Sequence, residues 1–122
     1  MYNEREKNTF EMHLADEHFE KIKSGEKTVE IRLFDEKRKN IKVGDCIVFC
    51  RGDGRDECVS TTVVALHRFK SFQELFSSEL FHKIGFGDMT YEEAATIMYK
   101  YYTQSQEQKY GVLGIEINRV GL

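Results

Sequence analysis

The segment 27–32 contains three side chains that could bind or transform a ligand: Lys27, Glu30 and Arg32. Glu30 and Arg32 are two residues apart, so on an extended strand they share a face and lie about 7 Å apart. Arginine offers a planar fork of N–H donors that suits a phosphate or the edge of guanine. Glu30 could orient Arg32, accept a hydrogen bond from an exocyclic amine, or act as a general base. The same pattern also fits a surface ion pair, worth less than about 1 kcal/mol.

Further polar and aromatic side chains could extend a binding surface around this segment. His13 falls on the polar side of a predicted first strand and could adjoin the same face, although a lone strand histidine is more often structural. Lys37, Arg38 and Lys39 follow in a predicted turn, where they could contact a phosphate backbone. Tyr110 could stack on a base or, equally, pack in the core. The candidate ligand-binding residues are therefore Lys27, Thr28, Glu30, Arg32, Lys37, Arg38, Lys39, His13 and Tyr110.

Charge is distributed unevenly along the chain. The net charge of −3 argues against a protein that coats nucleic acid without specificity. Residues 1–20 carry six acids and two bases, whereas residues 21–42 carry eight bases and four acids. A basic segment inside an acidic protein predicts a localised anion site, although a solvated charged surface would give the same counts.

The three cysteines, Cys46, Cys50 and Cys58, are an odd number. The charged start of the sequence lacks the apolar stretch of a signal peptide, and no apolar run approaches the roughly 18 residues of a membrane span. We therefore expect a cytoplasmic protein with free thiols. Cys46 and Cys50 on one strand would lie roughly 13 Å apart. That separation is too large for a zinc site completed by Cys58 and His67, so no metal or cofactor is expected.

Alternating residues predict strands in both halves of the sequence. We expect strands at 10–14, 27–34, 46–50, 58–66 and 111–120, with the Asp53–Gly54 pair in a hairpin loop. Thr28, Glu30 and Arg32 should line a groove on the polar face of the second strand. The apolar residues expected to be buried are Val29, Ile31, Leu33, Ile47, Phe49, Ile115 and Ile117.

Helices are predicted between these strands. Asp16 can cap a short helix that buries Phe19 and Ile22 and ends at Gly25. Segments 71–74 and 90–93 have the form of capping boxes. After the second box, the stripe of Ala94, Ile97, Met98 and Tyr101 predicts a helix face buried in the core, not a cofactor site. We expect a single domain over residues 1–122, with residues 1–9 flexible.

The element order does not alternate as in a parallel doubly wound sheet. It favours a mainly β protein with peripheral helices (α+β). Five or six short, mostly antiparallel strands would form a closed or nearly closed barrel, which also removes exposed strand edges.

Two neighbouring motifs add a family resemblance. GEKTVEIR (residues 25–32), followed by KVGDCIVF (42–49), resembles the ASCH domain signature, a G-x-K-x-x-E-x-R segment before a V-G-D-x-I-x-F turn and strand. FHKIGFGDMTYEEAA (81–95) and KYGVLGIEI (109–117) are similar to the later course of such domains, so the resemblance runs from about residue 10 to 120. It implies a PUA-like barrel with a cleft beside the GEKTVEIR strand. Because PUA relatives bind RNA, it also implies RNA or a nucleotide-like small molecule as the partner.

The resemblance also bears on catalysis. Some ASCH proteins resemble amidohydrolases that remove acyl groups from modified cytidine, and others resemble ribonucleases. The amidohydrolases use a lysine, a threonine three residues later and a glutamate in the helical segment. Lys27 matches the lysine, but Glu30 stands at the threonine position and Gly87 at the glutamate position. We therefore expect RNA or nucleotide binding, with hydrolysis through Lys27 and Glu30 as the alternative.

Overall fold

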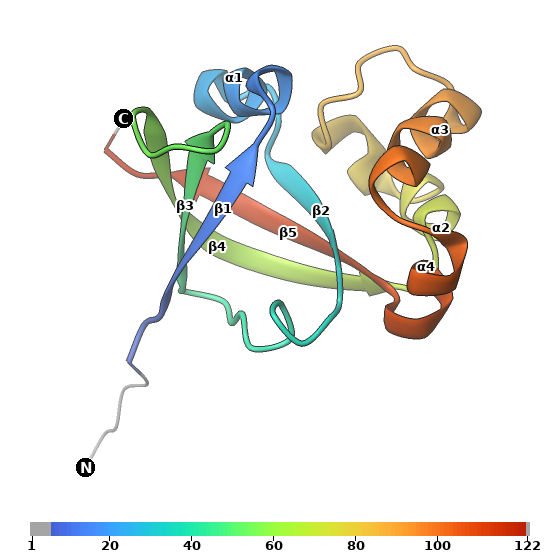
Figure 1. The fold of residues 1–122 in the computed structure, drawn as a ribbon, viewed down its shortest axis with the longest axis horizontal. Helices are drawn as coiled ribbons and strands as arrows, with labels where there is room; N and C mark the ends of the chain where they lie inside the picture. Colours follow the sequence, from blue (N-terminus) through green and yellow to red (C-terminus); the bar gives the residue numbers. More distant parts are fainter. Residues whose placement is uncertain (1–5, 122) are drawn as a thin grey trace.

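The fold is a single curved sheet with helices at one end and along one side (Figure 1). The computed structural model describes residues 6–121. The strands lie in the order β1–β3–β4–β5–β2. Their bounds are Thr9–Leu14 (β1), Val29–Leu33 (β2), Cys46–Arg51 (β3), Cys58–Phe69 (β4) and Val112–Arg119 (β5).

The sheet is an open half-barrel of mixed strand direction, so the expected closed antiparallel barrel is not confirmed. β1 pairs with β3 in parallel, whereas the β3–β4, β4–β5 and β2–β5 pairs are antiparallel. Parallel neighbours need a long crossover, and the chain between β1 and β3 supplies it. β1 and β2 are consequently the two edges of the described sheet, and the half-barrel is open between them.

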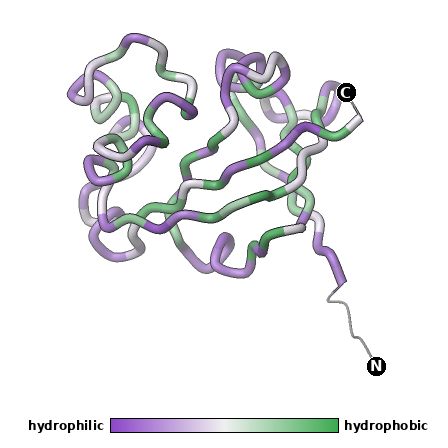
Figure 2. The backbone as a smooth tube through the Cα atoms, turned by 180° about the vertical axis from the view of Figure 1, so that it is seen from behind, coloured by the Kyte–Doolittle hydropathy of each residue, from purple (hydrophilic) through white to green (hydrophobic). Residues whose placement is uncertain are grey.

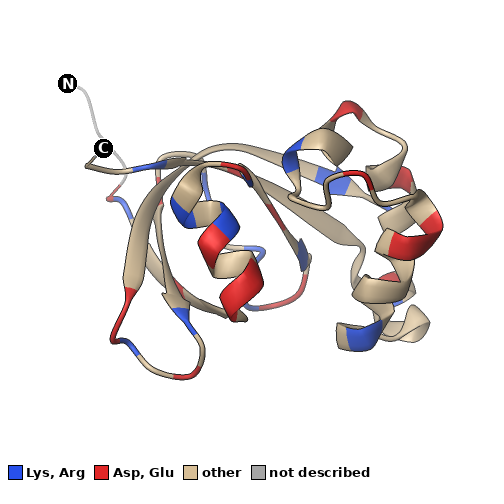
Figure 3. Cartoon of the chain, turned by 90° about the horizontal axis from the view of Figure 1, so that it is seen from above, with Lys and Arg blue, Asp and Glu red and all other residues tan. Residues whose placement is uncertain are grey.

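Helix α1 (Asp16–Ser24) lies across one end of the half-barrel, with its acidic residues at the start and its basic residues at the end (Figure 3). This distribution complements the helix dipole. Phe19 and Ile22 are buried and Gly25 ends the helix in the left-handed region at φ 88°, as predicted. The N-cap is Ala15, one residue before the Asp16 that we expected to cap the helix.

A helical segment connects β4 to β5 and covers the outer face of β2. It comprises α2 (Phe72–Phe76), the 3₁₀ helix η1 (Glu79–Lys83), α3 (Tyr91–Tyr101) and α4 (Gln104–Tyr110). Thr90 and Glu93 form the predicted capping box. Helix α4 was not predicted, because its sequence lacks an apolar stripe and Glu107 is its buried residue. None of the helices in the described chain is long and apolar enough to cross a membrane.

Two hydrophobic clusters lie on opposite faces of β2 and β5. The inner cluster fills the half-barrel around Phe19, Phe49 and Ile115, and the outer cluster joins β2 to the helical segment around Phe72 and Phe76. Viewed from behind, much of the green, hydrophobic colour lies along the strands, whereas the helices mix green with purple (Figure 2). All seven residues expected in the core are buried: Val29, Ile31, Leu33, Ile47, Phe49, Ile115 and Ile117.

The prediction of three free thiols was wrong. Cys50 and Cys58 form a disulfide, and Cys46 is the free cysteine of the described residues. Cys50 and Cys58 are directly opposite in the β3–β4 register, with their Cα atoms 4.1 Å apart. An argument from cysteine number and compartment cannot detect this proximity, because strand register creates it.

The described part of the chain makes contacts with the sheet earlier than expected. The Asn8 amide donates to Asp45 Oδ1 at 3.0 Å, and the Asn8 carbonyl oxygen accepts from the Cys46 amide at 2.9 Å. Asn8 and Thr9 are therefore part of the β1–β3 edge. Residues 1–5 of the segment expected to be flexible lie outside the described residues.

Candidate functional site

A cavity of about 130 Å³ lies where the half-barrel is open, between β1, β2 and α3. The end of β1 and the start of α1 form one wall, β2 forms the floor, and the helical segment forms the opposite wall. The lining residues are His13, Leu14, Ala15, His18, Lys27, Glu30, Ile31, Arg32, Phe86, Ile97, Met98, Tyr101 and Tyr102.

The floor carries a buried ion cluster of Lys27, Glu30 and Arg32, called here the floor cluster. Glu30 Oε1 lies 2.9 Å from Lys27 Nζ, and Glu30 Oε2 accepts from Arg32 Nε at 2.9 Å. Lys27 and Glu30 are only 5% and 4% exposed. The alternative of a solvent-exposed surface ion pair is therefore wrong for these residues.

Strand pairing explains why the floor cluster is buried. Glu30 and Arg32 lie opposite Ile115 and Leu113 on β5, on the face that contains the inner hydrophobic cluster. The alternate residues of β2 pack on the opposite face against the helical segment. Arg32 Nη2 also donates to the His13 carbonyl oxygen at 3.4 Å. A side chain thus bridges the two sheet edges, β1 and β2.

The electrostatics keep Glu30 ionised. Burial opposes the charge on Glu30, but the attraction of Lys27 and then of Arg32 lowers the pKa of its carboxyl to about 2. Burial alone would lower the pKa of Arg32, but the adjacent Glu30 carboxylate raises it. Two cations therefore face one carboxylate. An ammonium has three N–H donors and a guanidinium has five, so the contacts within the cluster use only part of their donor capacity.

Aromatic side chains form the walls above the floor cluster. Tyr102 stacks on Phe72, with ring centroids 5.8 Å apart, and burial raises the pKa of its hydroxyl. Tyr101 meets the His18 ring edge-on at 6.5 Å. Burial, reinforced by the positive charge of Lys27, lowers the pKa of His18, so its imidazole is neutral at neutral pH. The cavity therefore combines cationic donors, a neutral histidine and aromatic rings.

His18, Tyr101 and Tyr102 were not among the predicted binding residues, yet all three line the cavity. Tyr101 was assigned to a buried stripe, but it is 59% exposed, whereas Ala94 and Met98 in that stripe are buried. At the end of α3, Tyr101 lines the cavity and is exposed, whereas Tyr102 lines the cavity while packing on Phe72 of the outer hydrophobic cluster. No sequence signal set Tyr101 apart, because it continues the i, i+3, i+4, i+7 spacing of the stripe.

Of the predicted binding residues, the structure brings Lys27, Glu30, Arg32 and His13 to the cavity. The His13 ring, however, contacts the Gly52 carbonyl oxygen through Nδ1 at 2.7 Å and Glu11 through Nε2 at 2.8 Å. Hydrogen bonding to Glu11, and next to Gly52, raises the pKa of His13. The ring of His13 is therefore engaged by neighbouring residues.

The other predicted residues lie outside the cavity. Thr28 lines a separate cavity with Gly25, Asn118 and Arg119, so the prediction that it shares a groove with Glu30 and Arg32 was wrong. Tyr110 packs against the outer hydrophobic cluster. In the basic turn, Lys37 is exposed, Arg38 pairs with Asp35 at 2.9 Å and Lys39 pairs with Glu36 at 2.6 Å.

Within residues 6–121, no three His, Cys, Asp or Glu side chains are grouped as metal ligands.

Comparison with known proteins places this fold. The hypothetical protein PH0355 has 36% identity over 92% of this chain and 99% of its own, with a TM-score of 0.82. Protein PF0455 from Pyrococcus furiosus has 35% identity over 93% of this chain and 99% of its own, with a TM-score of 0.75. The ASCH domain from Lactobacillus crispatus shares the fold at 18% identity and a TM-score of 0.64, over 91% of this chain and 80% of its own.

No curated protein matches this sequence. The family model for the ASCH domain, however, matches residues 12–121. That range includes the floor cluster and both walls of the cavity, and it agrees with the structural likeness above. The chain therefore belongs to the ASCH domain family.

Proposed function

We propose that this ASCH domain binds single-stranded RNA or a nucleotide, with one base held in the cavity between β1, β2 and α3. The observation that carries the proposal is the floor cluster: two cations and one ionised carboxylate, buried beneath aromatic walls. Donors on Lys27 and Arg32 suit the carbonyl and ring-nitrogen acceptors of a base or the oxygens of a phosphate. Tyr101 and Tyr102 suit the flat face of a base, because stacking on aromatic rings tolerates any base.

The size of the cavity favours a single base. Its volume of about 130 Å³ has room for about ten water molecules, at roughly 10–15 Å³ for each. A nucleobase has a similar number of non-hydrogen atoms. In this proposal the ribose and phosphates lie outside the cavity, where the exposed Lys37 and Lys39 of the basic turn supply phosphate contacts.

Hydrolysis is less well supported by the same geometry. A general base works best when its pKa lies near the working pH, and the pKa of Glu30 is about 2. Both Glu30 oxygens contact a cation, and Thr28 lines a different cavity. These observations support binding as the function, with ribonuclease or amidohydrolase activity left as an outcome for experiment.

Titration of the protein into a fluorescently labelled single-stranded RNA of mixed sequence, about ten nucleotides long, tests the proposal. Cytidine monophosphate serves as competitor. We expect anisotropy to rise on binding and the affinity to fall as salt increases, because phosphate contacts release counterions. If no RNA or nucleotide associates at low salt, the proposal is wrong.

Two exposed tyrosines on α3 provide a matched pair of variants. Tyr101 lies at the cavity and is 59% exposed, whereas Tyr91 is 50% exposed and lies at the other end of the helix. Tyr101→Ala should weaken RNA binding by about 1–3 kcal/mol if a base stacks on it. Tyr91→Ala removes a similar side chain and should leave the affinity within about twofold. Equal effects of the two variants would place the RNA elsewhere on the surface.

A further inference from the structure

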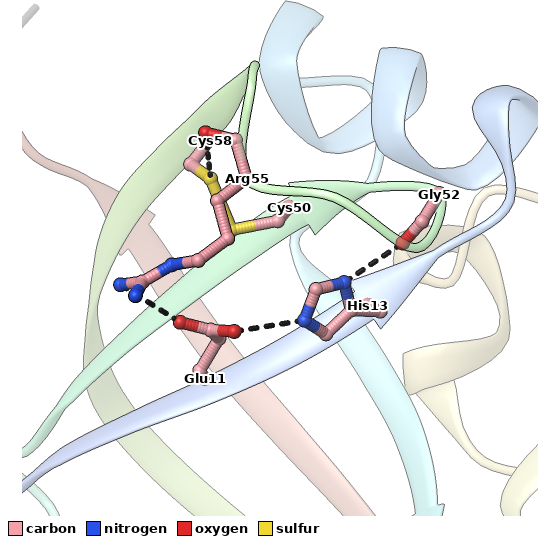
Figure 4. The surroundings of a disulfide bond; sticks show 6 residues. All are labelled: Glu11, His13, Cys50, Gly52, Arg55 and Cys58. Atoms are coloured by element: carbon pink, nitrogen blue, oxygen red, sulfur yellow. Dashed lines mark hydrogen bonds and ion pairs between the residues drawn. A yellow bond between two sulfur atoms is a disulfide. The ribbon is translucent and has the colours of Figure 1, made fainter.

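The disulfide closes a hairpin loop that lies against one wall of the cavity. Cys50 ends the β3–β4 pairing and Cys58 begins β4, so the bond joins the two strands at the base of loop 51–57. Figure 4 shows this loop extending over the end of β1, with Gly52 directed towards His13 and Arg55 towards Glu11. The loop is thus positioned by the disulfide on one side and by β1 on the other.

The contacts between the loop and β1 are specific. The Gly52 amide donates to the Leu14 carbonyl oxygen at 2.8 Å, and the Gly52 carbonyl oxygen lies 2.7 Å from His13 Nδ1. Arg55 Nη2 lies 3.0 Å from Glu11 Oε1. The loop therefore contacts β1 through both main-chain and side-chain groups (Figure 4).

The same loop also contacts α1. The Arg51 guanidinium lies over the Phe19 ring at 4.8 Å, and Arg51 Nη1 lies 3.5 Å from Asp16 Oδ1. Glu57 accepts from Arg51 Nε at 3.0 Å and lies 2.5 Å from Lys23 Nζ. The start and the last turn of α1 are consequently both linked to the loop that the disulfide closes.

The two elements that the loop contacts, β1 and α1, also line the cavity. The end of β1 and the start of α1 contribute His13, Leu14, Ala15 and His18 to its lining. The His13 carbonyl oxygen also accepts from Arg32 of the floor cluster. A change in the order of loop 51–57 would therefore alter the wall that positions both His18 and Arg32.

The two sulfurs differ in access. Cys58 is an exposed residue, whereas Cys50 is fully buried. Thiol–disulfide exchange requires a thiolate to reach one sulfur of the bond, so attack at Cys58 is favoured. The Arg55 carbonyl oxygen lies 3.7 Å from Cys58 Sγ, where it could accept a weak hydrogen bond from the reduced thiol.

We propose that Cys50 and Cys58 form a redox site, reduced by a dithiol, and that the oxidation state of this pair sets the affinity of the cavity for its ligand. The affinity part rests on the proposed function of RNA or nucleotide binding. The exposure of Cys58 supports this assignment, because an accessible sulfur is open to thiol–disulfide exchange.

Reduction of the disulfide proceeds in two exchange steps. A thiolate of the dithiol attacks Cys58 Sγ, which forms a mixed disulfide and releases Cys50 as a thiolate that takes up a proton. The second thiol of the reductant then attacks the reductant's other sulfur, which is bonded to Cys58 in the mixed disulfide. Cys58 leaves as a thiolate and is protonated. Two electrons and two protons pass to the protein, and the dithiol becomes a cyclic disulfide. Reoxidation by a disulfide of the same class reverses the sequence.

Reduction should weaken ligand binding. The cross-link limits the conformations open to the loop, and its loss frees loop 51–57 to move away from β1 and α1. A coupling between two sites in one protein typically changes affinity by about fivefold or more. We therefore expect the oxidised protein to bind the labelled RNA at least about fivefold more tightly than the reduced protein.

The experiment compares oxidised and dithiothreitol-reduced protein in the same anisotropy titration. Thiol titration should give one accessible or denaturant-exposed thiol, Cys46, before reduction and three afterwards. Cys58→Ser should bind like the reduced protein and lose its response to dithiothreitol. Cys46→Ser, a matched control outside the disulfide, should keep the full response. Equal affinity of the oxidised and reduced wild-type proteins would overturn the inference.

A second readout separates this inference from the proposed function. The Gly52 amide is bonded to Leu14, so its hydrogen exchange reports the contact between loop and β1, and NMR signals of the His18 ring report the cavity wall. If neither redox state binds RNA, the proposed function fails. In that case, faster Gly52 exchange and shifted His18 signals on reduction would still support the redox coupling to the cavity wall, and unchanged signals would reject it.

Discussion

At the residue scale, Glu30 determines whether the floor cluster can exist. Each of its oxygens contacts a different cation, Lys27 or Arg32, and the cluster is almost completely enclosed. Glu30→Gln keeps the shape of the side chain but leaves two cations without a counter-charge. Removing one partner of a buried ion pair costs about 3–5 kcal/mol, so we expect a loss of this size in the free energy of unfolding measured with urea.

Glu36→Gln is the matched control for Glu30→Gln, because it also replaces a carboxylate by an amide. Glu36 pairs with Lys39 on the surface, and its side chain is 82% exposed. Glu36→Gln should change the free energy of unfolding by less than about 0.5 kcal/mol. If Glu30→Gln lowers stability by no more than Glu36→Gln does, the floor cluster is not a buried charged unit.

The same carboxylate predicts how acid affects stability. The pKa of Glu30 is about 2 in the folded protein and 4.5 ordinarily, so the unfolded chain takes up the proton more readily. Its stabilising contribution is fully present above pH 4.5 and is lost as the pH falls towards 2. Urea unfolding of wild type and Glu30→Gln across this range should show their difference in stability shrinking with pH. A constant difference would contradict the assignment.

At the element scale, Glu107 connects three helices. From α4, its Oε2 accepts from the Phe72 amide at the start of α2 at 2.7 Å, and its Oε1 accepts from the Tyr99 hydroxyl of α3 at 2.6 Å. The hydrogen bond to Glu107, together with burial, raises the pKa of Tyr99 to about 12. The Glu107 carboxylate thus favours the protonated form of the Tyr99 hydroxyl.

Glu107→Gln tests this connection. Without the negative charge, the pKa of Tyr99 should fall towards its ordinary value of 10.0. A pH titration of tyrosinate absorbance should therefore show one tyrosine ionising earlier than in the wild type, and Tyr99→Phe identifies which one it is. Glu92→Gln removes a different carboxylate, exposed in the first turn of α3, and should leave the titration unchanged. An unaltered titration curve in Glu107→Gln would show that the contact is not made.

The elements themselves were largely predictable, but their partners were not. Alternation along Val29, Ile31 and Leu33 gave the strand and its core face, and Gly25 gave the end of α1. Local alternation does not specify which strand lies beside β1 or β2, so the parallel β1–β3 pair, the open edge and the disulfide were missed. These features depend on tertiary pairing.

Within the candidate site, the residues on one strand were predictable, but those contributed by other elements were not. Glu30 and Arg32 share a face because strands have a period of two, and the structure confirms this. His18 and Tyr101 reach the cavity from α1 and α3, which only the packed molecule brings together. Tyr110 was expected either to stack on a base or to pack in the core, and it packs against the outer hydrophobic cluster.

At the scale of the whole molecule, we expect no amidohydrolase activity. By the resemblance to the family's amidohydrolases, Lys27, Glu30 and Gly87 stand at the lysine, threonine and glutamate positions, so the nucleophilic hydroxyl and the carboxylate of that set are both absent. Losing members of a cooperating set typically lowers the rate by several orders of magnitude. We predict no release of the acyl group from acylated cytidine above background, measured by chromatography. Turnover that disappears in Lys27→Ala would contradict this prediction.

The parallel pairing of β1 also has a consequence for the order of folding. β3 and β4 are joined by a short hairpin, whereas the partners across β1 and β3, such as Thr9 and Cys46, are far apart in the chain. Contacts of high sequence separation form slowly, because a long loop must close first. We therefore expect β1, although it is synthesised first, to dock after the β3–β4 hairpin. Since β1 supplies one wall of the cavity, a nascent chain forms the cavity only when this late step is complete.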